Sequence, residues 1–370
     1  MPSSQAQHNI AWDLTGQLAD GLVAVGRHKV TLFAANNSVT KARLVHFDIG
    51  PLDSARESLS PADYREKVKE EETAMYTKMM EMATKEHIEL VHIHEPNESL
   101  VDLVARTPRA IPLLFTIHEP ILSNRLEGLE KLGGLEKCFL VTISKAQRNG
   151  FTTIPFFETV YHGVPIGDFP VGAGGQAQIM VAGRISGEKG FEDAIATASH
   201  TGDTLVIAGK VDQSLLGTNS YFREKIEPRL YDAKIVMKQF LSRPELAAYY
   251  GSSRAFLYPT KWEEPFGMVM LESMACGTPV IGYNRGCVPE LVVDGVTGFI
   301  VEPDEKSNLT NTSNLTKLAI KQKGIAGLVE AMGHVTEITR DACRSHVETN
   351  FSIGKMVTSY ENCYKKILSH

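Results

Sequence analysis

Two glutamates in one apolar segment, Glu264 and Glu272, are the first residues whose type and setting could carry chemistry. They lie in KWEEPFGMVMLESMACGTPVIGY (261–283). An unpaired carboxylate in such a stretch is costly unless it accepts hydrogen bonds. A ribose diol offers suitable donors, so the pattern favours a nucleotide-binding role for Glu272. Glu264, taken alone, is equally well explained as an acidic residue that favours the start of a helix.

The same segment predicts a helix from Pro265 to Cys276. Proline suits the first turn of a helix, where its missing N–H is not needed, and Gly277 suits the left-handed position just past the end. The preceding AFLYP (255–259) predicts a strand, so the helix should begin at the carboxyl edge of a sheet, where α/β proteins bind ligands. The backbone N–H groups expected to face a phosphate or a sugar hydroxyl belong to Phe266, Gly267 and Met268.

A second cluster, VAGRISGEKGFEDAI (181–195), has the pattern of a strand, a glycine-bearing loop and a helix. Arg184 and Lys189 flank the loop, and its glycines, Gly183 among them, allow tight turning. Two cations here could hold a diphosphate, arginine through its bidentate fork and lysine as a point charge. The glycine spacing is neither G-x-G-x-x-G nor a P-loop, and a solvated basic loop explains either cation alone. The indication therefore depends on the two clusters lying together.

Histidines stand near the ends of two predicted strands in the first half of the chain. TIHEP (116–120) places His118 at the carboxyl edge of its sheet, and VHIHEP (91–96) does the same for His92 and His94. Two positions apart on a strand, His92 and His94 share one face, as a metal site would need. Since no third ligand is apparent, we expect hydrogen-bonded histidines and no metal.

The elements that must position these residues alternate between short apolar runs and amphipathic segments of helix length, which is typical of parallel α/β architecture. One series of strands ends before residue 145 and a second lies between 178 and 301, which predicts two Rossmann-like domains joined by the Gly/Pro-rich stretch 163–175. Because a helix near 10–25 comes almost first, we expect the N-terminal sheet to lack its usual first strand or to use an irregular substitute for it. The predicted domains are 1–168 and 169–350, followed by a terminal helix in 351–370.

Composition narrows the classes of partner. The 370 residues carry a formal net charge of −6, which argues against nucleic acid, because that partner favours clustered Lys and Arg. No apolar run reaches the roughly 18 residues that span a bilayer and no secretory leader is apparent, so we expect a cytoplasmic protein without a transmembrane segment. Five cysteines without CxxC spacing predict reduced thiols. The polar stretch 304–324, with N-x-[ST] triplets at Asn308, Asn311 and Asn314, predicts a surface insertion.

The two clusters resemble the retaining GT-B glycosyltransferases of family 4, the glycosyl transferases group 1. EPFGMVMLE matches the E-x(7)-E motif of that family, and AGRISGEKG matches its G-R-x(4)-K-G motif. The similarity extends to VYHGVPIGDF and to the ending FSIGKMVTSYENCYKKIL, and covers most of the chain. It implies a GT-B fold with parallel sheets facing across a cleft, a nucleotide-diphosphate sugar donor, retention of configuration, and no metal or other cofactor. The terminal helix would cross back onto the N-terminal domain.

The resemblance also assigns roles to individual residues. Arg184 and Lys189 would neutralise the departing diphosphate. Glu264 would hold the transferred sugar, and His118 would contact that sugar from the other domain. These four are the expected catalytic residues, and the expected donor-binding residues are Phe266, Gly267, Met268, Val269, Glu272 and Gly183.

The reaction geometry and the partners are only partly indicated. Two glutamates along one helix do not supply the pair ~5 Å apart of a retaining hydrolase, so we prefer transfer on the front face, in which the donor phosphate deprotonates the acceptor. A UDP-sugar is the favoured donor, with GDP-mannose as the alternative. The acceptor is not indicated, and lipid, glycan, protein and small-metabolite acceptors all fit, as does a peripheral membrane contact.

Two other functions fit the same residues. One is another GT-B enzyme, such as a sugar-nucleotide epimerase or a phosphorylase, which needs no separate acceptor or uses free phosphate. The other is a degenerate transferase that serves as a binding subunit. The presence of both cations and both glutamates favours an enzyme over the binding subunit, whereas the short N-terminal region favours the reverse.

Overall fold

The computed structural model of the chain describes residues 10–34, 38–46, 60–107, 110–175, 177–211, 216–232, 234–304 and 318–370. The chain divides into two compact units. Unit 1 is formed by Met1–Ile143, Phe151–Tyr161 and Ile353–His370, and unit 2 by Ser144–Gly150 and His162–Ser352. The three asparagines Asn308, Asn311 and Asn314, and most of the expected insertion 304–324, lie outside the described residues.

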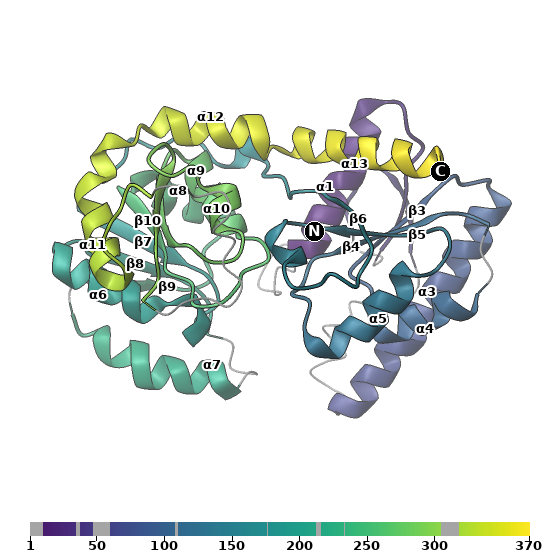
Figure 1. The fold of residues 1–370 in the computed structure, drawn as a ribbon, viewed down its shortest axis with the longest axis horizontal. Coiled ribbons are helices and arrows are strands. Elements are labelled where there is room, and N and C mark those ends of the chain that lie inside the picture. The colour runs from purple at the N-terminus through teal and green to yellow at the C-terminus, as the bar shows by residue number, and fades with distance from the viewer. Residues whose placement is uncertain are drawn as a thin grey trace. The chain divides into compact units, whose positions relative to one another are not determined.

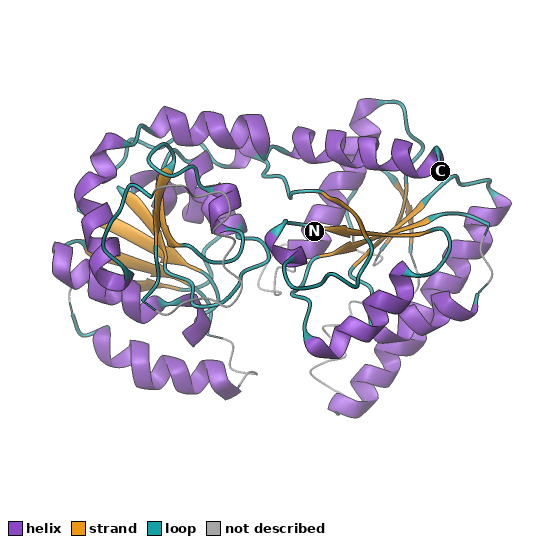
Figure 2. Cartoon of the chain, viewed as in Figure 1, coloured by secondary structure: helices purple, strands orange, loops and turns teal. Residues whose placement is uncertain are grey.

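Unit 2 contains a six-stranded parallel sheet (Figure 2). Its order is β12-β11-β10-β7-β8-β9, so the strand order reverses between β7 and β10, as in Rossmann-like sheets. Every residue of β10, β11 and β12 is buried, because helices cover the sheet. All six strands expected in this half are present. Their bounds are β7 Gln178–Ala182, β8 Thr204–Ala208, β9 Ile235–Lys238, β10 Ala255–Tyr258, β11 Val280–Tyr283 and β12 Gly298–Val301.

Two groups of helices cover this sheet. Helices α6 and α11 pack together and contact β7, β8, β11 and β12, whereas α8, α9 and α12 form a second group against β7, β10 and β11. Helix α8 begins with a capping box between Ser242 and Glu245 and has a proline in its first turn, both sequence signals for a helix start. The bounds are α6 Phe191–Thr201, α7 Leu216–Tyr221, α8 Arg243–Ser252, α9 Met268–Ala275, α10 Val288–Leu291, α11 Gly324–His334 and α12 Arg340–Asn350.

Unit 1 contains a four-stranded parallel sheet of order β3-β4-β5-β6 and a separate parallel pair, β1 with β2. All five residues of β4 are buried, and Leu113, Phe115 and Ile117 belong to a core that helices α3, α4 and α5 help to close. Because the described residues begin at Ile10, the first residue of α1, the expected lack of a first strand stays a prediction. The bounds are α1 Ile10–Val25, β1 Thr31–Phe33, β2 Arg43–Val45, α3 Pro61–Lys85, β3 Val91–His94, α4 Glu98–Arg106, β4 Leu113–Ile117, α5 Ser123–Gly133, β5 Cys138–Thr142, β6 Phe156–Thr159 and α13 Ile353–Leu368.

The last helix, α13, completes unit 1 and packs on α1 (Figure 1, yellow on purple). Glu361 of α13 accepts hydrogen bonds from Arg27 at 3.0 Å and from His28 at 2.8 Å, just after α1 ends. These contacts lower the pKa of Glu361, with the His28 hydrogen bond as the largest cause. The first and last described helices of the chain are therefore neighbours.

The fold class expected from the sequence is confirmed: two α/β units, each built on a parallel sheet. Short 3₁₀ segments connect the elements at Ala146–Arg148, Ile166–Asp168, Gly187–Lys189, Glu227–Arg229 and Val335–Glu337, and a π-helical segment at Phe222–Ile226 follows α7. Among the described residues, none of the helices combines the length and apolar character that crossing a bilayer requires.

Candidate functional site

The candidate site lies where the strand order of the unit 2 sheet reverses. Open α/β sheets bind ligands outside the carboxyl ends of their strands at such a switch point. The strands on its two sides are β7 and β10, which are hydrogen-bonded neighbours. The loop after β7 carries Gly183, Arg184 and Lys189, and the loop after β10 carries Glu264. The fold thus brings both sequence clusters to one edge of one sheet.

The two loops are also bonded to each other. The carbonyl of Glu188 accepts hydrogen bonds from the Lys261 N–H at 2.7 Å and from the Thr260 hydroxyl at 3.2 Å. Gly190 has φ +72°, and a Cβ there would lie 1.8 Å from the carbonyl oxygen of Pro259. Only glycine fits such a close backbone approach. Gly190 therefore has the predicted turn-forming role, and it also lets the loop after β7 approach the backbone directly after β10.

Glu264 and Lys189 meet directly. The ammonium of Lys189 forms an ion pair with Oε2 of Glu264, and both side chains are largely buried. The same oxygen accepts hydrogen bonds from the Tyr258 hydroxyl and from the Trp262 indole N–H, each at 2.9 Å. A buried carboxylate needs such partners, because burial without them is costly. The sequence singled out Glu264 and Lys189 but not Tyr258 or Trp262.

Arg184 has a different setting from Lys189. It is half exposed and pairs with Glu188 at 3.0 Å, so its guanidinium is held on its own loop. Burial, the largest single effect, acts to raise the pKa of Glu188, but hydrogen bonds from Ser186, from the Glu188 backbone N–H and from Arg184 together lower it. Gly183, with φ +148°, has open space where a Cβ would stand, so its backbone conformation rather than crowding favours glycine.

Helix α9 begins later than predicted. It spans Met268–Ala275 with Gly267 as its N-cap, so the expected start at Pro265 is wrong. The carbonyl of Glu264, which would bond to Met268 in a helix starting at Pro265, accepts instead from the N–H of Cys287 at 3.0 Å. A tertiary contact therefore overrides the local preference of proline for the first turn.

The residues at the start of α9 are tightly packed. Phe266 and Met268 have buried side chains, and Val269 is partly exposed. A Cβ on Gly267 would lie 2.5 Å from Cε of Met270 and 3.1 Å from the Tyr258 hydroxyl. Packing within the chain is thus a reason for glycine at 267. As N-cap, Gly267 has no side chain with which to cap the first N–H groups of the helix.

Helix α9 ends at Ala275, one residue before the predicted Cys276, and Gly277 has the predicted left-handed conformation. Gly277 has φ +81°, its N–H donates to the Met274 carbonyl, and the Thr278 N–H donates to the Ser273 carbonyl. This pair of bonds is the Schellman arrangement that ends helices at a left-handed glycine.

Glu272 lies within α9 and is partly buried. The Tyr250 hydroxyl donates to its Oε2 at 3.2 Å. Burial raises the pKa of Glu272 to about 6, although the Tyr250 hydrogen bond and the charge of Arg243 act in the opposite direction. The predicted need of this carboxylate for hydrogen-bond donors is therefore met in part by Tyr250.

His118 lies in unit 1, at the carboxyl end of β4. Its backbone N–H and that of Glu119 donate to Oε2 of Glu95 at 2.6 and 2.9 Å, and Arg125 forms an ion pair with the same carboxylate. The ring nitrogen Nε2 of His118 is 2.8 Å from Nδ1 of His94. Burial lowers the pKa of His118 to about 4, so its imidazole is neutral at pH 7. Glu95 and Arg125 were missed, although His-Glu-Pro occurs after both strands.

His92 and His94 share one face of β3, as predicted, with ring centroids 4.1 Å apart. His92 has two hydrogen-bond partners, the hydroxyls of Tyr364 and Thr116, both at 2.8 Å. Burial, with a smaller effect of His118, lowers the pKa of His92 to about 3. Within the described part of the chain, no group of three or more His, Cys, Asp or Glu side chains could bind a metal ion.

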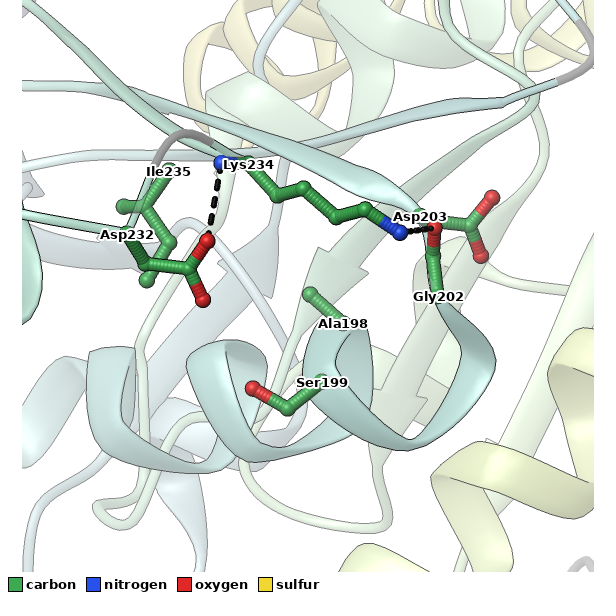
Figure 3. A pocket seen from close by; sticks show the side chains of 7 residues that line it. All are labelled: Ala198, Ser199, Gly202, Asp203, Asp232, Lys234 and Ile235. Atoms are coloured by element: carbon green, nitrogen blue, oxygen red, sulfur yellow. Dashed lines mark hydrogen bonds between the residues drawn. The ribbon is translucent and has the colours of Figure 1, made fainter.

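A small pocket of about 130 Å³ lies at the opposite, amino edge of the unit 2 sheet (Figure 3). Lys234 spans it, donating from its ammonium to the Gly202 carbonyl and from its backbone N–H to Asp232, both at 2.9 Å. Gly202 is the left-handed C-cap of α6, so Lys234 satisfies a helix end. This arrangement stabilises the fold and contains none of the predicted site residues.

Comparison with known proteins supports one class of protein, the glycosyltransferases. Residues 169–316, which include both loops of the candidate site, match the family model described as glycosyl transferases group 1. Solved structures of similar fold include sucrose-phosphate synthase from Thermosynechococcus elongatus (TM-score 0.71, 19% identity, 95% of this chain and 92% of that one) and a glycosyltransferase from Rickettsia africae (TM-score 0.66, 18% identity, 99% and 96%). The chain thus has the fold of GT-B glycosyltransferases.

A curated relative and a solved structure with bound ligands are also similar to this chain. Glycogen synthase from Mycobacterium tuberculosis is 28% identical over 224 residues, covering 54% of this chain and 53% of the relative. The chain thus spans about half the length of the curated relatives that head the comparison. The Anabaena protein Alr3699/HepE, solved in complex with UDP and glucose, has a TM-score of 0.66 at 15% identity over 98% of both chains. Together these matches support a GT-B glycosyltransferase.

Proposed function

We propose that this chain is a retaining, metal-independent glycosyltransferase that moves a sugar from a nucleotide-diphosphate sugar to an acceptor hydroxyl. The observation that carries the proposal is the ion pair of Lys189 with Glu264 beside the switch point of the unit 2 sheet. The family match over 169–316 supports it. A UDP-sugar is favoured over GDP-mannose, because the similar Anabaena structures contain UDP, glucose or UDP-glucose.

In the proposed reaction the bond between the donor's anomeric carbon and its phosphate oxygen breaks, and negative charge collects on the departing diphosphate. Arg184 and Lys189 stabilise that charge, together with the partial positive charge at the start of α9. The acceptor oxygen bonds to the same face of the anomeric carbon, and its proton passes to a donor phosphate oxygen. Glu272 accepts hydrogen bonds from the ribose.

The remaining roles concern the sugar. Glu264, with the backbone of Phe266, Gly267, Met268 and Val269, binds the transferred sugar, and Gly183 lets the diphosphate approach the loop after β7. The proposed role of His118, which comes from the family resemblance alone, is a hydrogen bond from its neutral imidazole to a sugar hydroxyl. A neutral ring suits this role, because it adds no charge beside the sugar.

Calorimetry with UDP, UDP-glucose and GDP-mannose, with and without EDTA, tests the donor. We expect micromolar binding of one nucleotide that EDTA does not weaken. Proton NMR of the sugar released by slow donor hydrolysis tests retention, since the α anomer should appear first from an α-linked donor. No binding of any nucleotide sugar would contradict the proposal.

The products separate the other candidate functions. Nucleotide release that depends on an added acceptor supports the transferase. Conversion of the donor sugar without an acceptor indicates an epimerase, and dependence on inorganic phosphate indicates a phosphorylase. Nucleotide binding without turnover across a broad acceptor panel indicates a binding subunit.

We further propose that the protein acts in the cytoplasm. Its five cysteines are all unpaired and buried, which accords with a reducing compartment. Burial raises the pKa of each thiol in the set Cys276, Cys287, Cys343 and Cys363. These cysteines are therefore kept in the unreactive thiol form.

A further inference from the structure

One oxygen of Glu264 receives three donors from three parts of the chain. The Tyr258 hydroxyl comes from the end of β10, the Trp262 indole N–H from the loop that follows, and the Lys189 ammonium from the segment after β7. All three bond to Oε2. Oε1 accepts no hydrogen bond from any residue that the structure describes.

Because all three donors bond to the same oxygen, they hold the Glu264 carboxylate in one orientation. An ionised carboxylate has about four lone-pair sites on its two oxygens, so one ion-pair partner would neutralise its charge while leaving it free to rotate. Three donors on Oε2 instead fix the plane of the group, and they leave Oε1 to accept from a ligand. Oε1 of Glu264 is an acceptor held in a fixed position, and the charge of the carboxylate is already paired with the Lys189 ammonium. Such an oxygen can accept a hydrogen bond from a ligand hydroxyl, whereas it would repel an anionic ligand.

Trp262 contacts both members of the ion pair. Its N–H donates to Glu264, and the Lys189 ammonium lies 5.0 Å from its ring centroid, within cation–π range. Tyr258 is fully buried, and burial together with the charge of Glu264 raises the pKa of its hydroxyl well above the usual range. Tyr258 therefore stays protonated and keeps donating at any working pH.

We propose that Trp262 and Tyr258 are positioning residues that orient Glu264 so that Oε1 accepts a hydrogen bond from a hydroxyl of the transferred sugar. The inference rests on the proposed function, because it assigns the sugar half of the donor to Glu264. It follows that different residues of the site bind the two halves of the donor. Trp262 and Tyr258 govern affinity for the sugar, whereas the nucleotide diphosphate is held without them.

The test compares UDP with UDP-glucose by calorimetry in the full chain. Trp262→Phe keeps a ring beside Lys189 but removes the N–H donor, and Tyr258→Phe removes only the hydroxyl. Each variant should bind UDP within two-fold of wild type and UDP-glucose about ten-fold more weakly, the effect of losing one hydrogen bond to a charged group. Trp262→His, which restores a ring N–H, should recover part of the loss.

Tyr283→Phe is the matched control. Its hydroxyl also donates to a carboxylate, Asp193, at 2.7 Å, and Tyr283 is buried in the same unit, but it has no bond to Glu264. This variant should bind both ligands as wild type does. Circular dichroism and melting temperature check that every variant is folded.

The outcomes separate the inference from the function beneath it. If wild type binds UDP and UDP-glucose but both variants lose affinity for the two ligands equally, or lose none, the positioning role is wrong and the proposed function stands. If wild type binds none of UDP, UDP-glucose and GDP-mannose, the proposed function fails and the inference fails with it. A selective loss in Tyr258→Phe alone restricts the positioning role to Tyr258 and overturns it for Trp262.

Discussion

Lys189 and Glu264 form an ion pair that joins the loop after β7 to the loop after β10, with side chains only 15% and 10% exposed. Breaking such a buried pair leaves one charge without its partner. Lys189→Met should therefore lower the free energy of unfolding by about 2 to 4 kcal/mol, less than complete isolation would, because Tyr258 and Trp262 still donate to Glu264. The double variant with Glu264→Gln should lose less than the sum of the single variants in urea unfolding. Strictly additive losses would contradict this coupling.

Arg184→Ala should separate binding from stability. Its partner Glu188 is four residues away and both side chains are well exposed, so the ion pair adds about 0 to 1 kcal/mol to stability. UDP affinity, by contrast, should fall by about 1.5 to 3 kcal/mol, because a charge-assisted contact to phosphate is lost. Glu188→Gln, which frees the guanidinium, serves as the opposite control and should bind UDP at least as tightly as wild type. Equal UDP affinity in Arg184→Ala would remove Arg184 from the site.

Glu272 should make stability fall with rising pH over a defined window. Its pKa is raised from 4.5 to about 6 in the folded chain, so between these values the folded state binds more protons than the unfolded state. The stabilisation is complete below pH 4.5 and is lost as pH rises through 6. Glu272→Gln should abolish this part of the pH dependence, and its stability relative to wild type should increase across the window. Parallel pH profiles for the two proteins would show that Glu272 does not titrate there.

Gly190 and Gly187 form a matched pair in one loop. Alanine at Gly190 needs φ +72° and places a Cβ 1.8 Å from the Pro259 carbonyl oxygen, so the two loops must separate. Gly190→Ala should cost more than about 3 kcal/mol of stability, the range of large backbone and overpacking effects. In Gly187→Ala the Cβ meets only the Tyr221 ring at 3.5 Å, an ordinary contact, and thermal unfolding should shift little. Similar melting temperatures for both variants would refute the proposed loop contact.

Arg340 should resist replacement by lysine. Its guanidinium donates to the carbonyls of Gly172, Gly251, Ser253 and Cys276, which belong to three separate segments of unit 2 because Gly251 and Ser253 both lie at the end of α8. A lysine carries three donors on one atom and cannot reproduce this spread. Arg340→Lys should destabilise the chain by about 2 kcal/mol in urea unfolding, because buried carbonyls lose their partners. A loss under 0.5 kcal/mol would mean that water replaces the guanidinium freely.

The strands of unit 2 were predictable because each is a short apolar run covered by helices on both sides, a pattern that depends on local sequence alone. Helices α4 and α5 and strands β2 and β6 were not foreseen. The residues of β6 are all only partly buried, so its sequence lacks the continuous apolar run that marks a covered strand. The start of α9 was misplaced because the Cys287 N–H, distant in sequence, takes the Glu264 carbonyl.

Some residues of the candidate site could likewise be predicted from the sequence, and others could not. Lys189 and Glu264 could be found from charge in unusual settings and from motif spacing. Tyr258 and Trp262 could not, since a tyrosine at a strand end and a tryptophan in a loop become informative only when their donors converge on one oxygen. Glu95 became visible only through the N–H groups of His118 and Glu119, which lie more than twenty residues away.

The packing of α13 on α1 has a consequence for synthesis on the ribosome. The described elements of unit 2 are complete once Ser352 has been made, whereas unit 1 lacks α13 until Leu368 has been made. Helix α1 therefore has no α13 to pack against while unit 2 is being translated, and the apolar face that contacts α13 stays uncovered during that time. A stop codon in place of Ile353, which removes α13, would leave unit 2 with all its described elements and would leave unit 1 incomplete, as a target for chaperones or proteases.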